Sequence, residues 1–255
     1  GYPPPPPPGG GYLPPPPLGS RPSFRIGDAV SWAWQKFTRN AVPLVVATLI
    51  FGLLFGVLGS LSGLLQQAVA PETVTAYDGA DGLIETSTIS LPGGGIAVLI
   101  LSSVLQLVVT ALVAAAYFGG MLDIANGQPV SVGSFFRPRH VVSVMLAALL
   151  VGLLTAIGLF LCILPGVIVI IFTWFTTVAL VDRNLSPLDG IRASFGIAKS
   201  NLGPVLLAWL TSLALLVVGA LLCLVGLLVA APLAYLVQVY AYRRLSGGSV
   251  SPAAI

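Results

Sequence analysis

Residues 141–181 read VVSVMLAALLVGLLTAIGLFLCILPGVIVIIFTWFTTVALV, and none of these 41 residues carries a charge. A single α-helix of that length would extend about 62 Å, because each residue adds about 1.5 Å, whereas the hydrocarbon core of a bilayer is only about 30 Å thick. The stretch is therefore expected to cross a membrane twice. The reversal is predicted at residues 163–166, because Pro165 lacks a backbone donor and Gly166 can adopt the backbone angles that a turn needs.

Further uncharged stretches lie on either side of this one. Residues 41–70 and 96–120 are each long enough for one crossing, and 204–242 is expected to fold back near Gly226. The sequence thus predicts an all-α, polytopic integral membrane protein whose six transmembrane helices form three hairpins. The expected spans are 41–70, 96–120, 141–161, 166–181, 204–222 and 227–242. The fourth and sixth have only about 16 residues each, so a re-entrant path is the alternative to a full crossing.

The composition and the charges fit a membrane as the solvent. Hydrophobic residues make up 56% of the chain and charged residues 7%, whereas a soluble domain has about 25% charged residues. With six spans, all 11 Lys and Arg fall on one side, while the loop 71–95 carries acids and no basic residue. The positive-inside rule then predicts a multi-pass protein of the cell membrane with both termini in the cytoplasm. Because the basic residues are scattered at helix ends, no nucleic acid partner is expected.

Residues 1–22 form a proline- and glycine-rich segment without apolar periodicity. Such a segment is expected to be polyproline II or disordered and to lie in the cytoplasm. It is interpreted as a tether, with a docking segment for a proline-motif reader as the alternative. The membrane domain is predicted over residues 23–245, and residues 246–255 are predicted to form a short disordered C-terminus.

Each hairpin is expected to follow an amphipathic helix at the membrane interface. In residues 24–40, apolar side chains recur at helical spacing, and the Trp residues are expected at headgroup level. The apolar positions are Ile26, Val30, Ala33, Trp34 and Phe37. A second copy of this segment lies 161 residues further along. The offset aligns Asp28 with Asp189, Trp34 with Phe195, Asn40 with Asn201 and Pro43 with Pro204.

The second copy carries its own helix-start signal. Ser186 is a candidate N-cap, Pro187 suits the first turn, and Asp189 completes a capping-box-like pattern. A degenerate third copy at 132–136 is expected to introduce the middle hairpin, so the fold is interpreted as three repeated units. One face of the helix after Ser186 is expected to be apolar, with Leu188, Ile191, Phe195, Ala198 and Leu202.

The segment GDAVSWAWQKF at residues 27–37, which follows the proline-rich head, resembles the mycobacterial proline- and glycine-rich transmembrane proteins, a family of uncharacterised actinobacterial multi-pass proteins. This resemblance covers essentially the whole chain. The second half, with LPG at 164–166, VDR at 181–183 and DGIRAS at 189–194, is also similar to a bacterial membrane domain that in some relatives precedes a glycerophosphodiester phosphodiesterase domain. The resemblance implies the fold and a membrane location, and it leaves the activity open.

Small residues follow one side of the first expected span in two GxxxG patterns. The glycine stripe consists of Gly52, Gly56, Gly59 and Gly63. Small residues let helices approach closely, so packing against another helix of the same chain is the favoured interpretation. A docking face for a second copy or for another membrane protein is the alternative.

Cys162 and Cys223 each lie just before the outward turn of a hairpin. They are interpreted as small buried residues, with a disulfide as the alternative.

Aromatic and basic residues near the ends of the spans are expected to anchor the helices at the membrane interface. These candidate anchors are Trp32, Trp34, Arg39, Arg137, Arg139, Arg192, Lys199, Arg243 and Arg244. The lipid bilayer is the partner that this pattern requires.

The chain offers little reactive chemistry. No ionisable residue lies in the middle of an expected span, which argues against an ion-coupled carrier, and the acids of the outer loop have no histidine beside them. No catalytic, cofactor-binding or metal-binding residue is therefore assigned, and no enzyme is expected. Polar residues inside the spans either line a passage or, as favoured, hydrogen-bond between helices. They are Gln66, Gln67, Gln106, Thr173, Thr176, Thr177 and Gln238.

Two classes of function remain. A non-enzymatic scaffold or accessory subunit of a larger cell-envelope complex is favoured by the proline-rich segment, the glycine stripe and the absence of buried charge. A transporter or lipid-handling protein for a small or apolar solute is the alternative, because internal repeats and helices broken by Gly or Pro are common in carriers. The second class predicts a cavity lined by the Gln and Thr residues above. Solid packing there counts against it, and a wide apolar groove open to lipid supports it.

Overall fold

The computed structural model describes residues 24–69, 72–77, 85–90, 94–222 and 225–252, so the proline- and glycine-rich residues 1–22 lie outside the described residues. Helices account for most of the described chain. In chain order the elements are α1 (Ile26–Arg39), α2 (Ala41–Ala68), β1 (Glu72–Tyr77), β2 (Glu85–Ser90), α3 (Gly95–Ala125), the short 3-10 helix η1 (Val132–Phe136), α4 (Val141–Leu161), α5 (Ile163–Phe172), α6 (Thr176–Arg183), α7 (Pro187–Ser200), α8 (Leu202–Leu221) and α9 (Leu227–Leu245).

Within the described residues, five helical segments are long and apolar enough to cross a membrane. They are α2, α3, α4, the segment Ile163–Arg183 that comprises α5 and α6, and α8. The expected spans 41–70 and 141–161 agree with α2 and α4 to within two residues. α9 is not among the five, because its 19 residues include Gln238, Arg243 and Arg244. The expected class of helical, multi-pass membrane protein is therefore confirmed.

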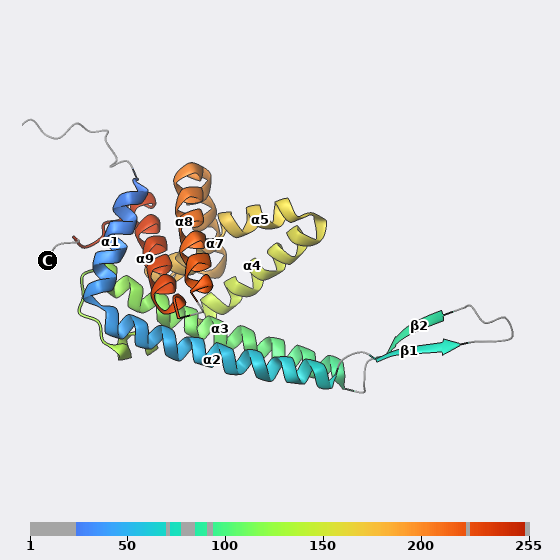
Figure 1. Cartoon of the computed structure of the whole chain (residues 1–255). Helices are drawn as coiled ribbons and strands as arrows, with labels where there is room; N and C mark the ends of the chain where they lie inside the picture. The colour runs from blue at the N-terminus through green and yellow to red at the C-terminus, as the bar shows by residue number, and fades with distance from the viewer. Residues whose placement is uncertain (1–23, 70–71, 78–84, 91–93, 223–224, 253–255) are drawn as a thin grey trace, which may run out of the picture.

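The loop 71–95 contains a β-hairpin that the sequence analysis missed. β1 and β2 pair in antiparallel register, from Glu72 opposite Ser90 to Tyr77 opposite Glu85. Figure 1 shows the two strands beyond the far ends of α2 and α3. The strand sequences are ETVTAY and ETSTIS, and both contain Thr and other residues with high strand propensity. This composition was the signal that could have predicted the hairpin.

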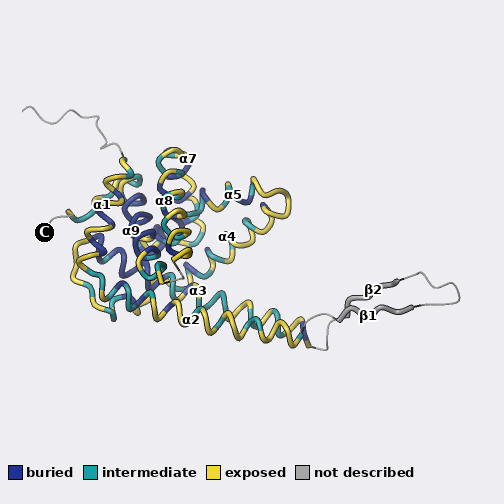
Figure 2. Tube along the Cα trace, in the orientation of Figure 1, coloured by how far each residue is buried: buried dark blue, intermediate teal, exposed yellow. Residues whose placement is uncertain are grey.

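The core lies where α3, α6 and α9 end. Arg243 joins the three ends, because its Nη2 donates hydrogen bonds to Asp182 Oδ1 at 2.6 Å and to Asn126 Oδ1 at 3.0 Å. Figure 2 shows the buried positions gathered in this part of the molecule. We call it the packed end, meaning α1, η1, α6 and the C-terminal halves of α3 and α9. Large side chains that are fully buried here include Tyr242, Phe135, Phe175, Met121, Leu180 and Leu236.

Away from the packed end, the helices carry exposed apolar side chains. Figure 1 shows α4 and α5 extending away from the other helices, and Phe160 near their tip is 92% exposed. α2 exposes Leu53, Val57, Leu61 and Leu64 in the same manner. Lipid tails are as apolar as leucine, so a membrane helix loses little by exposing such residues.

The reversal between α4 and α5 is one residue earlier than expected, and Gly166 does not have the role in the turn that was predicted for it. Cys162 has extended backbone angles, and α5 begins at Ile163. Pro165 therefore lies in the first turn of α5, where its missing donor costs little. Gly166 does not provide a left-handed turn; it permits close packing, because a Cβ on Gly158 would lie only 2.9 Å from the Gly166 Cα.

Gly226 has a similar role between α8 and α9. Its φ of −60° is helical. A Cβ on Gly226 would lie 3.0 Å from the Cα of Gly219. Both expected turn glycines thus let two helices approach closely just after they reverse.

A three-residue break separates α5 from α6. Ser194 of α7 bridges the break, since its Oγ donates to the Phe172 carbonyl at 2.8 Å and accepts from the Phe175 N–H at 3.0 Å. Gln238 of α9 donates to the Trp174 carbonyl at 2.7 Å. Side chains from two other helices therefore satisfy backbone groups that the break leaves free.

α1 packs on α9 through a face that is rotated from the expected one. Ala29, Trp32, Ala33, Lys36 and Phe37 are buried, whereas Trp34 is 52% exposed. Trp32, which was expected to anchor α1 at headgroup level, is buried within the chain, and its depth in the membrane stays a prediction. Its ring lies 5.4 Å from that of Tyr240, and its Nε1 donates to the Ser251 carbonyl at 2.9 Å. Ala33 and Phe37 belong to both faces, so periodicity alone could not choose between them.

α7 begins as expected. Ser186 accepts from the Asp189 N–H at 3.3 Å and donates to Asp189 Oδ2 at 2.6 Å, and this hydrogen bond holds the pKa of Asp189 below its usual value. Within the chain, α7 packs through Gly190, Ser194 and Ala198, and of these only Ala198 belongs to the expected apolar face. The large side chains of Leu188, Phe195 and Leu202 are exposed, while the small residues let α7 pack closely against the rest of the chain.

The C-terminal segment 246–255 was expected to be disordered; the structure describes its residues 246–252, which contact the end of α3. The Ser251 N–H donates to the Ala125 carbonyl at 2.8 Å, and its Oγ donates to the Ile124 carbonyl at 3.3 Å. The last carbonyls of a helix lack partners within the helix, and this segment supplies them at the end of α3.

Candidate functional site

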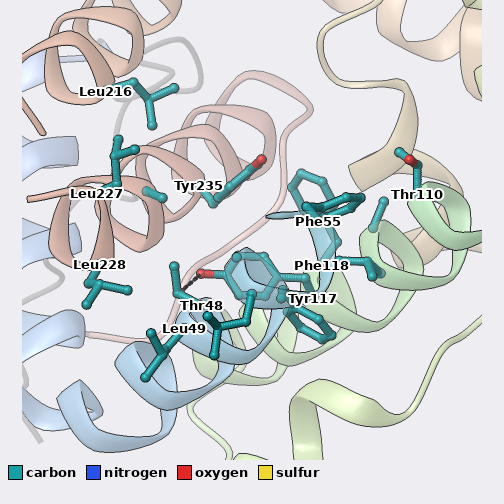
Figure 3. A pocket seen from close by; sticks show the side chains of 16 residues that line it. Thr48, Leu49, Phe55, Thr110, Tyr117, Phe118, Leu216, Leu227, Leu228 and Tyr235 are labelled. Atoms are coloured by element: carbon teal, nitrogen blue, oxygen red, sulfur yellow. Dashed lines mark hydrogen bonds between the residues drawn. The ribbon is translucent and has the colours of Figure 1, made fainter. Parts of the chain in front are cut away.

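A groove with a volume of about 620 Å³ lies between the helix pair α2 and α3 and the helix pair α8 and α9. Figure 3 shows the side chains that line it. They come from residues 48–55, residues 110–118, Leu216 and residues 227–235. We call it the apolar groove. Its volume lies in the range of about 300–1,000 Å³ that is usual for small-molecule sites.

The walls of the apolar groove are hydrocarbon. None of its 16 described lining residues is charged. Leu49 and Leu53 of α2 are 43% and 62% exposed and lie at the rim. Because α2 is one of the five segments suited to cross a membrane, this rim faces the region where lipid tails are expected.

Two hydroxyl groups form a pair inside the groove. The Thr48 Oγ1 lies 2.8 Å from the Tyr117 hydroxyl and 2.7 Å from the Leu44 carbonyl, to which it donates. A threonine hydroxyl has one proton, so the Tyr117 hydroxyl must be the donor in the pair. The Tyr117 oxygen therefore keeps the capacity to accept a further hydrogen bond.

Tyr235 of α9 packs its ring beside that of Tyr117, and Figure 3 shows its hydroxyl pointing away from the Thr48–Tyr117 pair. Its ring lies edge-on to those of Tyr117 and Phe118, each at 5.3 Å between centroids. The residue is 37% exposed, and its hydroxyl makes no hydrogen bond within the described part of the chain. In an apolar environment a hydroxyl without a partner is unfavourable, so the Tyr235 hydroxyl is open to a ligand.

Aromatic packing fixes the floor of the groove. The Tyr117 ring lies 5.9 Å from that of Phe51 and 5.6 Å from that of Phe135, which is fully buried in η1. Phe51 in turn lies 4.9 Å from Phe136. The Tyr117 hydroxyl is thus held by the packed end and not by a mobile loop.

The polar residues that the sequence suggested for a passage do not line the groove. Gln238 hydrogen-bonds to the backbone between α5 and α6, as favoured, and the Thr173 hydroxyl donates to the Val169 carbonyl at 2.7 Å. Gln66 and Gln67 are exposed, and the Thr176 Oγ1 is buried with no partner among the described residues. The alternative interpretation, a passage lined by these Gln and Thr residues, is therefore not supported by the lining of the groove. Tyrosines inside apolar helices were the signal that was overlooked, and the polar lining residues are Thr48, Thr110, Tyr117 and Tyr235.

The glycine stripe has no partner helix among the described residues. A Cβ added to Gly52, Gly56, Gly59 or Gly63 would meet no atom within 4 Å. The favoured interpretation, packing within the chain, therefore finds no contact to support it. Gly52 lines the apolar groove, and Gly52 and Gly56 line a shallow hollow on α2 itself. The docking interpretation stays a prediction.

Several candidate anchors link parts of the chain. Both Nη atoms of Arg139 bind the Asp123 carboxylate, at 3.0 and 3.1 Å. Arg192 lies 3.3 Å from Asp189, and the guanidinium of Arg244 lies 5.5 Å from the Tyr240 ring centre. Of these contacts, only the Arg139–Asp123 pair links separate elements, because the other two each lie within one helix. Contact of Trp34, Arg39, Arg137 and Lys199 with the membrane interface stays a prediction.

The cysteines and the acidic residues form no metal site in the described chain. Cys162 is exposed and free, so the expectation that it is buried was wrong, and Cys223 lies outside the described residues. Among the residues that the structure describes, no group of three or more His, Cys, Asp or Glu could hold a metal ion.

Comparison with curated proteins finds close relatives in mycobacteria. The chain is 40% identical over 230 residues to the uncharacterized protein Rv2560 of Mycobacterium tuberculosis, a match that covers 89% of this chain and 70% of the relative. It is 41% identical over 230 residues to the uncharacterized protein Mb2590 of Mycobacterium bovis, with the same coverage.

A shorter match concerns another membrane protein. The UPF0259 membrane protein WIGBR3650 of Wigglesworthia glossinidia brevipalpis is 32% identical over 83 residues, which cover 31% of this chain and 32% of that protein. No family model matches the chain, and no solved structure matches it.

Proposed function

We propose that this chain, which belongs to the family of the uncharacterized mycobacterial protein Rv2560, is a cell-membrane protein that binds an apolar or amphiphilic molecule in the apolar groove. The observation that carries the proposal is an uncharged groove of about 620 Å³ whose rim is formed by exposed leucines of a membrane-crossing helix. This makes lipid handling the better supported of the two classes that the sequence left open.

The proposal includes a topology with six crossings and both termini in the cytoplasm. α9 supplies the sixth crossing, because its apolar N-terminal part packs beside α8 and its end lies next to the ends of α3 and α6. α1 and α7 are proposed to lie at the inner membrane surface, where each precedes a helix pair. A reporter fused after Gly82 should be active outside the cytoplasm, and one fused after Asn184 should be active inside it. The opposite pattern at either site would disprove the topology.

Binding in the apolar groove can be tested by filling it. Ala231 lines the groove on α9, so Ala231→Phe places a ring in the space that a ligand chain would occupy. The matched control is Ala97→Phe on the exposed surface of α3, away from the groove. Each protein is placed in nanodiscs that contain a photoreactive diazirine fatty acyl lipid, and the labelled peptides are identified by mass spectrometry.

Wild type and Ala97→Phe should be labelled on the peptides that line the groove, from α2 and α9. In Ala231→Phe, labelling of these peptides should be about tenfold weaker than in wild type. A tenfold change corresponds to about 1.4 kcal/mol of binding free energy. Equal labelling of the groove peptides in Ala231→Phe and in wild type would contradict ligand binding in the groove.

A scaffold or accessory subunit is the second candidate, and the glycine stripe favours it. A Cβ added to any of the four glycines would meet no other helix of the described chain, which leaves a surface where a helix of a partner can approach closely. Gly56→Leu would close this surface. If the chain is a subunit, mild detergent extraction should recover a defined larger complex with wild type and lose it with Gly56→Leu.

A further inference from the structure

We infer that α1 is a clamp that holds two walls of the apolar groove together, and that release of α1 from α9 opens the groove. The inference rests on the proposed function, because it concerns how access to the same groove is regulated. α1 is placed for this role, since it is joined directly to one wall, α2, and packs on another wall, α9.

The connection between α1 and α2 has no flexible linker. Only Asn40 separates the two helices, and its backbone N–H donates to the Lys36 carbonyl at 3.2 Å, while its carbonyl accepts from the Leu44 N–H at 3.1 Å. The Asn40 side chain also donates to the Lys36 carbonyl, at 2.9 Å. Thr48, which lines the groove, lies about one turn beyond Leu44. A movement of α1 is therefore transmitted to the α2 wall of the groove.

The contact between α1 and α9 is aromatic and is tied to the C-terminal segment. The Trp32 ring lies 5.4 Å from that of Tyr240, and the Trp32 Nε1 donates to the Ser251 carbonyl at 2.9 Å. The Ser251 N–H donates to the Ala125 carbonyl at the end of α3, at 2.8 Å. Tyr235, which lines the groove, lies about one and a half turns before Tyr240. One short part of α9 thus holds α1 and forms a wall of the groove.

The clamp also closes a ring of helices. η1 packs on α2 and α3, which precede it in the chain, and α7 packs on α4, α5 and α6, which precede it. α1 packs on α8 and α9, the last helices of the described chain. The apolar groove lies at this closing joint, between the pair α8 and α9 and the pair α2 and α3. α1 therefore joins the two sides of the groove.

The membrane interface offers α1 a second place to dock. The face of α1 that packs on the chain is mainly apolar, whereas the other side exposes Asp28, Ser31, Gln35 and Thr38. An amphipathic helix of this kind buries its apolar face at a membrane surface. Release from α9 then exchanges one apolar partner for another, and the face of Trp32 and Phe37 is not transferred to water.

The test measures the distance between the groove walls with the whole chain in phosphatidylcholine nanodiscs. Cys162→Ala and Cys223→Ala remove the native thiols. Val57→Cys on α2 and Val229→Cys on α9 then carry spin labels, because both side chains are exposed and neither lines the groove. Double electron–electron resonance gives the distribution of distances between the labels.

Two variants weaken the clamp in different places. Ser251→Pro removes the N–H that anchors the C-terminal segment to α3, and it should raise the fraction of longer distances about three- to tenfold, which is what the loss of one hydrogen bond provides. Trp32→Ala should raise this fraction further, because it also removes the ring contact with Tyr240. Trp34→Ala is the matched control on the same helix, since Trp34 is 52% exposed, and it should leave the distribution unchanged.

A second pair of labels separates opening of the groove from general loosening of the protein. Leu153→Cys on α4 and Val217→Cys on α8 replace exposed side chains on helices that α1 does not join, so their distance should stay the same in every variant. Size-exclusion chromatography confirms that each variant is folded.

The outcomes separate the inference from the proposed function. An unchanged distance between α2 and α9 in both Ser251→Pro and Trp32→Ala overturns the inference, and so does an equal change between α4 and α8. Loss of lipid labelling in Ala231→Phe would then still support a binding groove. Labelling that survives Ala231→Phe overturns the proposed function, and the spin-label distances still decide whether α1 clamps the two walls.

Discussion

The packed end and the apolar groove share α3 and α9, but they differ in what the side chains of these helices contact. At the packed end, α3 and α9 bring Tyr242, Met121 and Leu236 into full burial, and Arg243 pairs with Asp182. A few turns further along, α2, α3, α8 and α9 enclose a space of about 620 Å³. Close packing is thus concentrated at one end of the molecule, and the proposed binding site lies where the helices leave a space.

The largest effect is expected from breaking the ion pair at the packed end. The side chains of Arg243 and Asp182 are only 16% and 14% exposed, so Arg243→Ala would leave a carboxylate buried without its partner. We expect the free energy of unfolding to fall by about 3–5 kcal/mol. Thermal unfolding in detergent measures it. Arg244→Ala, which removes an exposed neighbour, should change stability by less than about 1 kcal/mol.

The next effect concerns the backbone between α5 and α6. Ser194→Ala removes the hydroxyl that bonds to the Phe172 carbonyl and to the Phe175 N–H, and it leaves both groups without that partner. A loss of about 1–3 kcal/mol is expected in the same unfolding measurement. Ser31→Ala on the exposed side of α1 is the control. Equal stability of the two variants would show that Ser194 is not needed to hold the break.

The third prediction compares the stability of two Gly→Ala variants, one at a tightly packed position and one at an open position. A Cβ on Gly120 would lie 2.5 Å from the Phe135 ring, whereas a Cβ on Gly152 would meet no atom within 4 Å. Both changes to Ala gain about 1 kcal/mol of helix propensity, but Gly120→Ala also crowds the core at a cost of about 1–3 kcal/mol. Gly152→Ala should therefore be the more stable variant, and the reverse order would contradict the packing at η1.

The smallest effect on stability is expected in the groove. Ala231→Phe fills open space, so the free energy of unfolding should stay within about 0.5 kcal/mol of wild type. The same variant should lose most of the ligand labelling. A large loss of stability would mean that the groove is a tightly packed region, and the contrast with the packed end would then be lost.

The repeated segment shows which structural features could be inferred from the sequence and which could not. Asn40 and Asn201, which the offset of 161 residues aligns, make equivalent hydrogen bonds, with Nδ2 donating to the Lys36 carbonyl at 2.9 Å and to the Ile197 carbonyl at 3.1 Å. Their neighbours differ, because Trp32 packs on Tyr240 while α7 packs through Gly190, Ser194 and Ala198. The aligned residues thus make the same local bond, but the alignment could not predict which face each helix buries.

The candidate site was less predictable than the fold. Thr48 and Tyr117 are 69 residues apart, and their hydrogen bond depends on how α2 and α3 are placed side by side. Tyr235 reaches the same groove from α9. In the sequence these residues are single polar groups within apolar helices, and nothing in their local pattern distinguishes them from residues that only pack.

The sequence by itself determined the membrane class, the positions of the long helices and the charge asymmetry, because these depend on length, hydropathy and the order of charged segments along the chain. Only the tertiary structure decided that α3, α6 and α9 meet in a core, that Trp32 is buried, that the glycine stripe of α2 faces no helix in the described chain, and that a groove remains between two helix pairs. In lipid, helices gain little from hiding apolar surface, so their arrangement depends on close packing and on a few hydrogen bonds between residues far apart in the chain.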